Sequence, residues 1–247
     1  MTSNLQVVVL AAAPQHAPAA ACNVAVAADT TRYVAFVDPA ANGDVPEAAQ
    51  QVRVLEEHPE WAAFSPMRSI VNVDAIQTFD LQALIARTPA LCLSGAVIRR
   101  SELMAVGGFD EGLRTGYDFD LWLRLARRGG VIGGAASAEP QETVNAADAV
   151  ARIESLITVL ERFAARYLVD QPTRTALRAR IMWLIDRLEI EQAKCRMLEG
   201  HFDAARFHLA SARRPTWQIR MALAALRLTP RLARVVYRVA PTFATFL

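Results

Sequence analysis

The segment from Leu93 to Gly130 holds the residues of this chain that are best suited to chemistry. It reads LSGAVIRRSELMAVGGFDEGLRTGYDFDLWLRLARRGG, an order that predicts a strand, a short helix, a glycine turn and a second helix. Asp118 and Asp120 lie in the first turn of that second helix, where free amides and the helix dipole stabilise a carboxylate. An ionised carboxylate accepts protons, so Asp118 is a candidate general base toward a hydroxyl group.

The same residues also have a structural interpretation. Gly107-Gly108-Phe109-Asp110 is typical of a tight turn that needs positive φ. Thr115 or Asp118 is suited to cap the helix expected over 118–128, and Asp120 favours its first turn. Both interpretations of the segment stay open at this point.

The rest of the front half must position this segment. Strands are predicted at 5–10, 33–37 and 91–98 from their apolar runs, with further candidates at 61–65 and 69–73. Helices are predicted at 46–58 and 74–87, and after Pro18. This alternation predicts an α/β domain over residues 1–134 with a mostly parallel, Rossmann-like sheet.

The back half has a different pattern. A small-residue linker at 135–143 leads into a predicted helical domain over 145–247. Its expected helices are 145–168, 173–199, 201–213, 216–228 and 230–239.

Charge is distributed unevenly between the two halves. Residues 1–150 contain ten arginines and seventeen acids, whereas 151–247 contain seventeen basic residues and eight acids. No acid follows Asp203, although eight arginines do. The basic half is suited to an anionic surface or an acidic partner, and residues 229–247 in particular to an anionic membrane. Pairing with the acids of the front half, or simple solvation, is the alternative, and no nucleic-acid partner is expected.

Composition places further bounds on the chain. With 247 residues, of which 53% are hydrophobic, it can bury a real core. Cys22, Cys92 and Cys195 match no metal-binding spacing. There is no signal-peptide pattern, and no apolar run reaches the roughly 18 residues of a membrane span. We expect a cytoplasmic protein, with a peripheral position at the inner membrane face as the alternative.

From about Leu5 to Gly130 the sequence resembles family 2 glycosyltransferases, which have the GT-A fold. The resemblance is closest at 93–130, the acceptor-side motif of that family. It implies that Asp118 is the acid of the Glu-Asp motif, the general base on the acceptor hydroxyl, with Tyr117 in place of the glutamate. It also implies an acceptor-side loop, formed here by Gly107, Gly108, Asp110 and Asp120.

The donor side of the resemblance is less complete. AACNVAV at 20–26 occupies the place of an Arg-Asn-x-Gly motif and retains Asn23. Asp38 matches the first acid of an Asp-x-Asp motif, and Ala40 stands where the second belongs. The resemblance implies a nucleotide sugar with Mg²⁺ or Mn²⁺, but these cations prefer several oxygen ligands, so no complete metal site is predicted. Asp38 is therefore a degenerate donor or metal residue, or only a turn residue after a strand.

The chain also begins at what corresponds to the fourth strand of the fold, so the nucleotide-base pocket has no counterpart. A sheet without its leading strands exposes an edge near 5–10 or 33–37, which we expect a second copy, a partner protein or the helical tail to cover. The resemblance implies a glycosyltransferase of cell-envelope polysaccharide or lipid-linked glycan synthesis. The missing pocket, Ala40 and Tyr117 favour the alternative, a non-catalytic relative that binds glycans, scaffolds an assembly or adapts to a membrane surface.

Overall fold

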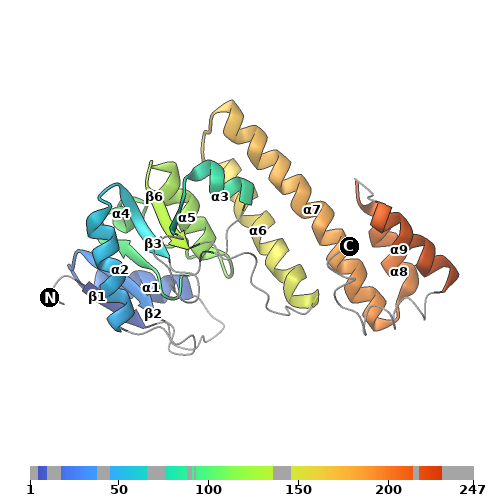
Figure 1. The fold of residues 1–247 in the computed structure, drawn as a ribbon, viewed down its shortest axis with the longest axis horizontal. Helices are drawn as coiled ribbons and strands as arrows, with labels where there is room; N and C mark the ends of the chain where they lie inside the picture. Colours follow the sequence, from blue (N-terminus) through green and yellow to red (C-terminus); the bar gives the residue numbers. More distant parts are fainter. Residues whose placement is uncertain are drawn as a thin grey trace. The chain divides into compact units, whose positions relative to one another are not determined.

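The computed structural model describes residues 5–9, 18–37, 45–65, 76–87, 91, 93–135, 146–213 and 217–229. The chain packs as two compact units. The first comprises residues 1–140 and 162–177, and the second comprises 141–161 and 178–247. Figure 1 traces the elements of both units from β1, near the amino terminus, to α9.

The described part of the first unit contains a six-stranded sheet in the order β1-β2-β5-β3-β6-β4. Its strands are β1 (Leu5–Val9), β2 (Tyr33–Val37), β3 (Trp61–Ser65), β4 (Ile76–Phe79), β5 (Val97–Arg99) and β6 (Val131–Ala135). The helices of this unit include α1 (Pro18–Ala27), α2 (Val45–Glu57), α3 (Leu81–Arg87), α4 (Arg100–Ala105) and α5 (Tyr117–Arg127). The predicted α/β class is confirmed.

The sheet is mixed rather than mostly parallel. β1 pairs in parallel with β2, and β3 with β6. β5 lies antiparallel between β2 and β3, and β4 runs antiparallel to β6 at the edge. A mostly parallel sheet needs a helix that returns the chain between successive strands, whereas β3 and β4 run in opposite directions with no described helix between them.

Several predicted elements match the structure closely. The strands at 33–37 and 61–65 are confirmed. β1 ends one residue before its predicted end, and α2 begins and ends one residue earlier than predicted. The helix predicted over 74–87 is wrong in its first part, because Ile76–Phe79 form β4. The strand predicted over 91–98 is confined to Val97–Arg99, and β6 was not predicted. The candidate strand at 69–73 lies outside the described residues.

The two faces of the sheet bury different sets of side chains. Since alternate strand residues face opposite sides, Tyr33 and Ala35 of β2 share one face, where they pack with Leu55 of α2. Phe36 lies on the other face, and its ring meets that of Phe109 edge-on with centroids 5.4 Å apart. The loop that contains the glycine turn is therefore anchored on the sheet face opposite α2.

The described helices of the second half are α6 (Ala146–Arg166), α7 (Gln171–Glu199), α8 (Phe202–Ser211) and α9 (Trp217–Leu228). They correspond to four of the five predicted helices, and the fifth, at 230–239, lies outside the described residues. In the second unit, α7, α8 and α9 share a core, to which Ile190, Leu209 and Leu226 contribute. None of the described helices combines the length and the apolar character that crossing a membrane would need.

Candidate functional site

The glycine turn connects α4 to the segment that leads into α5. Gly107 and Gly108 have φ values of 82° and 71°, which confirms the predicted positive φ. The Gly107 N–H donates to the carbonyl of Met104, and the Gly108 N–H to that of Leu103, both at 3.0 Å. These bonds close the last turn of α4 and send the chain back over the sheet.

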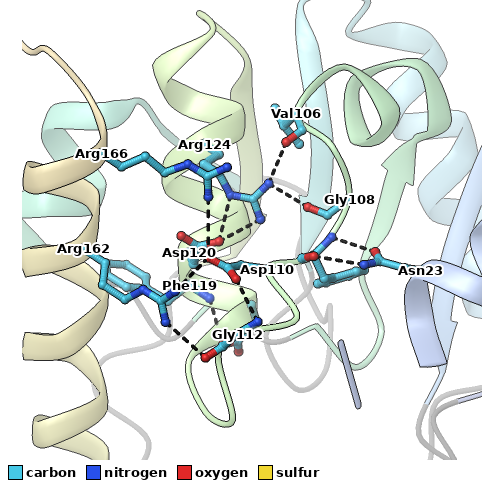
Figure 2. A network of polar contacts seen from close by, with 12 residues as sticks. Asn23, Val106, Gly108, Asp110, Gly112, Phe119, Asp120, Arg124, Arg162 and Arg166 are labelled. Carbon is cyan, nitrogen blue, oxygen red and sulfur yellow. Dashed lines mark hydrogen bonds and ion pairs between the residues drawn. The ribbon is translucent and has the colours of Figure 1, made fainter. Parts of the chain in front are cut away.

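Arg124 of α5 holds this turn from one side. Its guanidinium donates to the carbonyls of Val106 at 2.9 Å and Gly108 at 2.6 Å. The same group binds the Asp120 carboxylate, with Nε–Oδ2 and Nη2–Oδ2 distances of 2.8 and 2.7 Å. Both residues are about 95% buried. Figure 2 shows the guanidinium between the carboxylate and the two carbonyls.

Asp120 is therefore part of an internal ion pair. Burial raises the pKa of its carboxyl, and the charge of Arg124 opposes that rise. The pair joins residues four apart on one helix, a spacing at which side chains are neighbours. That spacing is the sequence signal that could have identified Arg124 as the partner of Asp120.

Asn23 of α1 holds the loop from the other side (Figure 2). Its Oδ1 accepts the Phe109 N–H at 2.8 Å, and its Nδ2 donates to the Phe109 carbonyl at 3.0 Å. The same Nδ2 donates to Glu111 Oε1 at 2.9 Å. The amide pairs with both main-chain polar groups of one residue, so it fixes the backbone of Phe109.

Asp110 lies beside the Asp120–Arg124 pair and faces α6. Its Oδ1 accepts the Gly112 N–H at 2.9 Å, and its Oδ2 lies 3.5 Å from guanidinium nitrogens of Arg162 and Arg166. Arg162 also donates to the Gly112 carbonyl at 3.1 Å. Since the two arginines are about half exposed, these contacts are weaker than those of Arg124.

Asp118 follows this clamped loop, in the first turn of α5. The helix is capped by Gly116 in the left-handed conformation, without a capping side chain, so the predicted cap by Thr115 or Asp118 is wrong. Asp118 Oδ1 instead accepts the N–H of its neighbour Phe119 at 2.8 Å. The carboxyl is half-buried, so part of it stays accessible to a ligand.

Two further titratable groups, Tyr117 and Cys22, lie near this turn, and both Asp118 and Cys22 act electrostatically on the Tyr117 phenol. Burial, together with the charges of Asp118 and Cys22, raises the pKa of the Tyr117 phenol to about 12. Burial raises the pKa of the Cys22 thiol to about 11. Near neutral pH both groups therefore keep their protons.

Arg99 has a structural position rather than an exposed one. It is buried, and it donates to the carbonyls of Trp61 at 2.7 Å, His58 at 3.2 Å and Leu55, and to the Tyr33 hydroxyl at 3.2 Å. Two of these carbonyls lie at the carboxyl end of α2, where a cation is favourable. The guanidinium thus joins α2 to β2 and β3.

Arg100 does the same at the end of α1. Its guanidinium donates to the carbonyls of Val26 and Thr31, and to the side chain of Gln6. Both arginines are therefore engaged within the unit and are not free to approach a phosphate.

A divalent cation does not fit the described part of this site. Asp110 and Asp120 are held by arginines, and the described residues contain no group of three or more His, Cys, Asp or Glu that could hold a metal ion. Asp38, Ala40 and Asp44 lie outside the described residues. The structure thus brings Gly108, Asp110 and Asp120 together with Asn23, while their predicted acceptor-side role and that of Asp38 stay sequence predictions.

Comparison with known proteins gave structural likeness only. No family model matches the sequence, and no curated protein matches it. The mannosyltransferase PcManGT from Pyrobaculum calidifontis, in complex with GDP-Man and Mn²⁺, is similar in structure, with 18% identity and a TM-score of 0.45 over 90% of this chain and 66% of that one. TarS from S. aureus has 13% identity and a TM-score of 0.45, over 90% of this chain and 43% of that one. A TarS 1–349 structure has 12% identity and a TM-score of 0.43 over 92% and 72%. The chain thus spans just under two thirds of PcManGT and less than half of the longer TarS chain.

Proposed function

We propose that this chain is a family 2-type glycosyltransferase that acts on a hydroxyl of a glycan or lipid-linked acceptor. The observation that supports it best is the clamped loop before Asp118. Arg124 and Asn23 fix the backbone of this loop, and the half-buried carboxylate of Asp118 lies further along the chain, in the first turn of the helix that carries Arg124. A carboxylate on a helix that is joined to a fixed loop is suited to proton transfer, since a preorganised site needs little motion to reach the reacting geometry.

In the proposed reaction, the Asp118 carboxylate accepts the proton of the acceptor hydroxyl. The hydroxyl oxygen then forms a bond to the anomeric carbon of the donor sugar, and the bond from that carbon to the nucleotide diphosphate breaks. Mg²⁺ or Mn²⁺, if bound with the nucleotide sugar, would neutralise charge on the leaving diphosphate. Asp38 is the candidate residue on the donor side. We further propose that the acceptor belongs to cell-envelope polysaccharide synthesis and that the chain reaches it from the cytoplasm.

The test is a transfer assay. Purified protein is incubated with radiolabelled UDP- and GDP-sugars, Mn²⁺ and a lipid extract that contains the acceptor. We expect Asp118→Asn to lower the rate at least a hundredfold, because general-base catalysis contributes about 10²–10⁴-fold. Asp203→Asn removes an exposed carboxylate of the second unit and should leave the rate unchanged. Absence of transfer with every donor, without a thermal shift from any nucleotide sugar, would refute the proposal.

The alternative is a non-catalytic relative that binds a glycan through the same loop. It is favoured by Ala40 and Tyr117, which stand where the resemblance implies acids. In that case glycan binding, measured by calorimetry, would be retained in Asp118→Asn and lost when the loop clamp is removed by Asn23→Ala.

A further inference from the structure

The helix α9 has two faces of opposite character. Ile219 and Leu226 are buried in the core of the second unit, and Ala222 and Leu223 pack against that core. The opposite face is exposed and consists of Arg220, Met221, Ala224, Arg227 and Leu228. At about 100° per residue, these five residues span a sector of about 120°.

The exposed face combines apolar and basic side chains. Met221 is 62% exposed and Leu228 81% exposed, and they lie on the same side of the helix. Arg220 and Arg227 lie about two helical turns apart in the same sector. Neither forms an ion pair with any described residue. The face therefore presents unpaired positive charge beside an apolar strip.

The surrounding sequence strengthens this charge. No acid occurs after Asp203, so the arginines of α9 have no neighbouring carboxylate along the last 44 residues of the chain. Arg231, Arg234 and Arg238 follow α9 directly. A partner of this surface must therefore supply negative charge, and it must also accept apolar side chains.

We propose that the exposed face of α9 binds the surface of an anionic lipid bilayer. Met and Leu side chains can enter the boundary between headgroups and acyl chains, while arginines beside them contact lipid phosphates. Arginine suits this position because its planar guanidinium binds phosphate oxygens in pairs. An acidic protein or a nucleic acid would use the charges but would leave the apolar strip without a comparable environment.

The test is co-sedimentation of the intact chain with vesicles of phosphatidylcholine alone or with a quarter phosphatidylglycerol. We expect binding to the anionic vesicles and little to the neutral ones. Arg220→Gln/Arg227→Gln should weaken binding by about fivefold per arginine at moderate salt. Met221→Ser/Leu228→Ser should weaken it by roughly tenfold or more, because both side chains are exposed in the free protein and lose apolar contact with lipid.

Matched controls exist in the first unit. Val24→Ser changes an apolar side chain that is 71% exposed on α1, and Arg53→Gln changes an exposed arginine of α2. Neither control should alter binding, and circular dichroism should show that all variants are folded. Equal binding to both vesicle types, or α9 variants that bind like the controls, would overturn the proposal. So would tight binding to single-stranded DNA by a chain that ignores vesicles. This readout involves no sugar transfer, so its failure would leave the proposed function standing.

Discussion

Asn23 has a local task that depends on its amide group. One side-chain oxygen and one side-chain nitrogen pair with the N–H and the carbonyl of Phe109. Aspartate at this position would keep the acceptor and lose the donor, and serine would be too short to reach both groups. Asn23 therefore has a structural role in this chain that is independent of any ligand.

Replacement of Asn23 by alanine should destabilise the protein by about 1–3 kcal/mol, because it leaves the polar groups of Phe109 without their partners. The measurement is urea unfolding followed by tryptophan fluorescence. The neighbouring Val24→Ser, which changes an exposed side chain of the same helix, serves as the control. Equal unfolding free energies for the two variants would contradict the clamp.

Cys22 gives the stability a pH dependence in the alkaline range. Its pKa is about 11 in the folded chain and 9.0 as an ordinary value, so the unfolded chain loses this proton first as pH rises. The folded state then binds more protons than the unfolded state, and stability must fall between about pH 9 and pH 11. Over this range the loss should be about 2–3 kcal/mol.

The unfolding free energy should be measured from pH 8 to 10.5 for the natural chain and for Cys22→Ala. We expect a shallower decline in the variant, whatever its absolute stability. Parallel slopes would show that this thiol does not titrate differently in the two states.

At the scale of elements, the turn between α4 and α5 separates two roles of glycine. Gly107 and Gly108 both have positive φ, but only Gly108 is crowded. A Cβ on Gly108 would lie 2.5 Å from Asn23 Oδ1, whereas a Cβ on Gly107 would meet no described atom within 4 Å. A substitution at Gly107 therefore tests the backbone conformation alone. A substitution at Gly108 also tests the close contact with the Asn23 side chain.

Gly107→Ala should cost about 1–2 kcal/mol, the usual penalty for a side chain in the left-handed region. Gly108→Ala should cost more, because the Asn23 side chain must also move. Combined with Asn23→Ala, the Gly108→Ala penalty should fall back toward that of Gly107→Ala, which a double-mutant cycle measures by urea unfolding. Additive effects in that cycle would argue against the close contact.

The sequence predicted elements well where a single local rule decides them. The β-branched run of β2 and the two glycines of the turn are of this kind. Prediction from the sequence failed where pairing with a distant strand determines the secondary structure. Ile76–Phe79 has a helix-compatible pattern, yet it pairs with β6 as an edge strand. Likewise, the role of Arg162 depends on a fold contact fifty residues away in sequence, which no spacing rule reveals.

At the scale of the whole molecule, the two compact units do not follow the change in composition along the chain. Composition predicts domains at 1–134 and 145–247, a division that stays a prediction. Residues 162–177, which include the end of α6 and the start of α7, pack with the first unit. Arg162 and Arg166 contact Asp110 in the loop after the glycine turn, and the Arg127 guanidinium lies 4.3 Å from the centre of the Tyr167 ring.

This packing predicts that residues 162–177 stabilise the first unit. Phe163 and Leu177 are each only 1% exposed, and Thr173 accepts a hydrogen bond from Gln82 at 2.7 Å. Burial of each apolar side chain contributes about 1.5–3 kcal/mol, so a fragment of residues 1–161 should melt roughly 10 °C below a fragment of residues 1–177.

A substitution in the intact chain tests the same packing without creating new chain ends. Phe163→Ala should lower the free energy of unfolding by about 3–5 kcal/mol. Differential scanning calorimetry measures both. Equal melting temperatures of the two fragments would instead favour a boundary at 134–145, because residues 162–177 would then add nothing to the unit that carries Asp118.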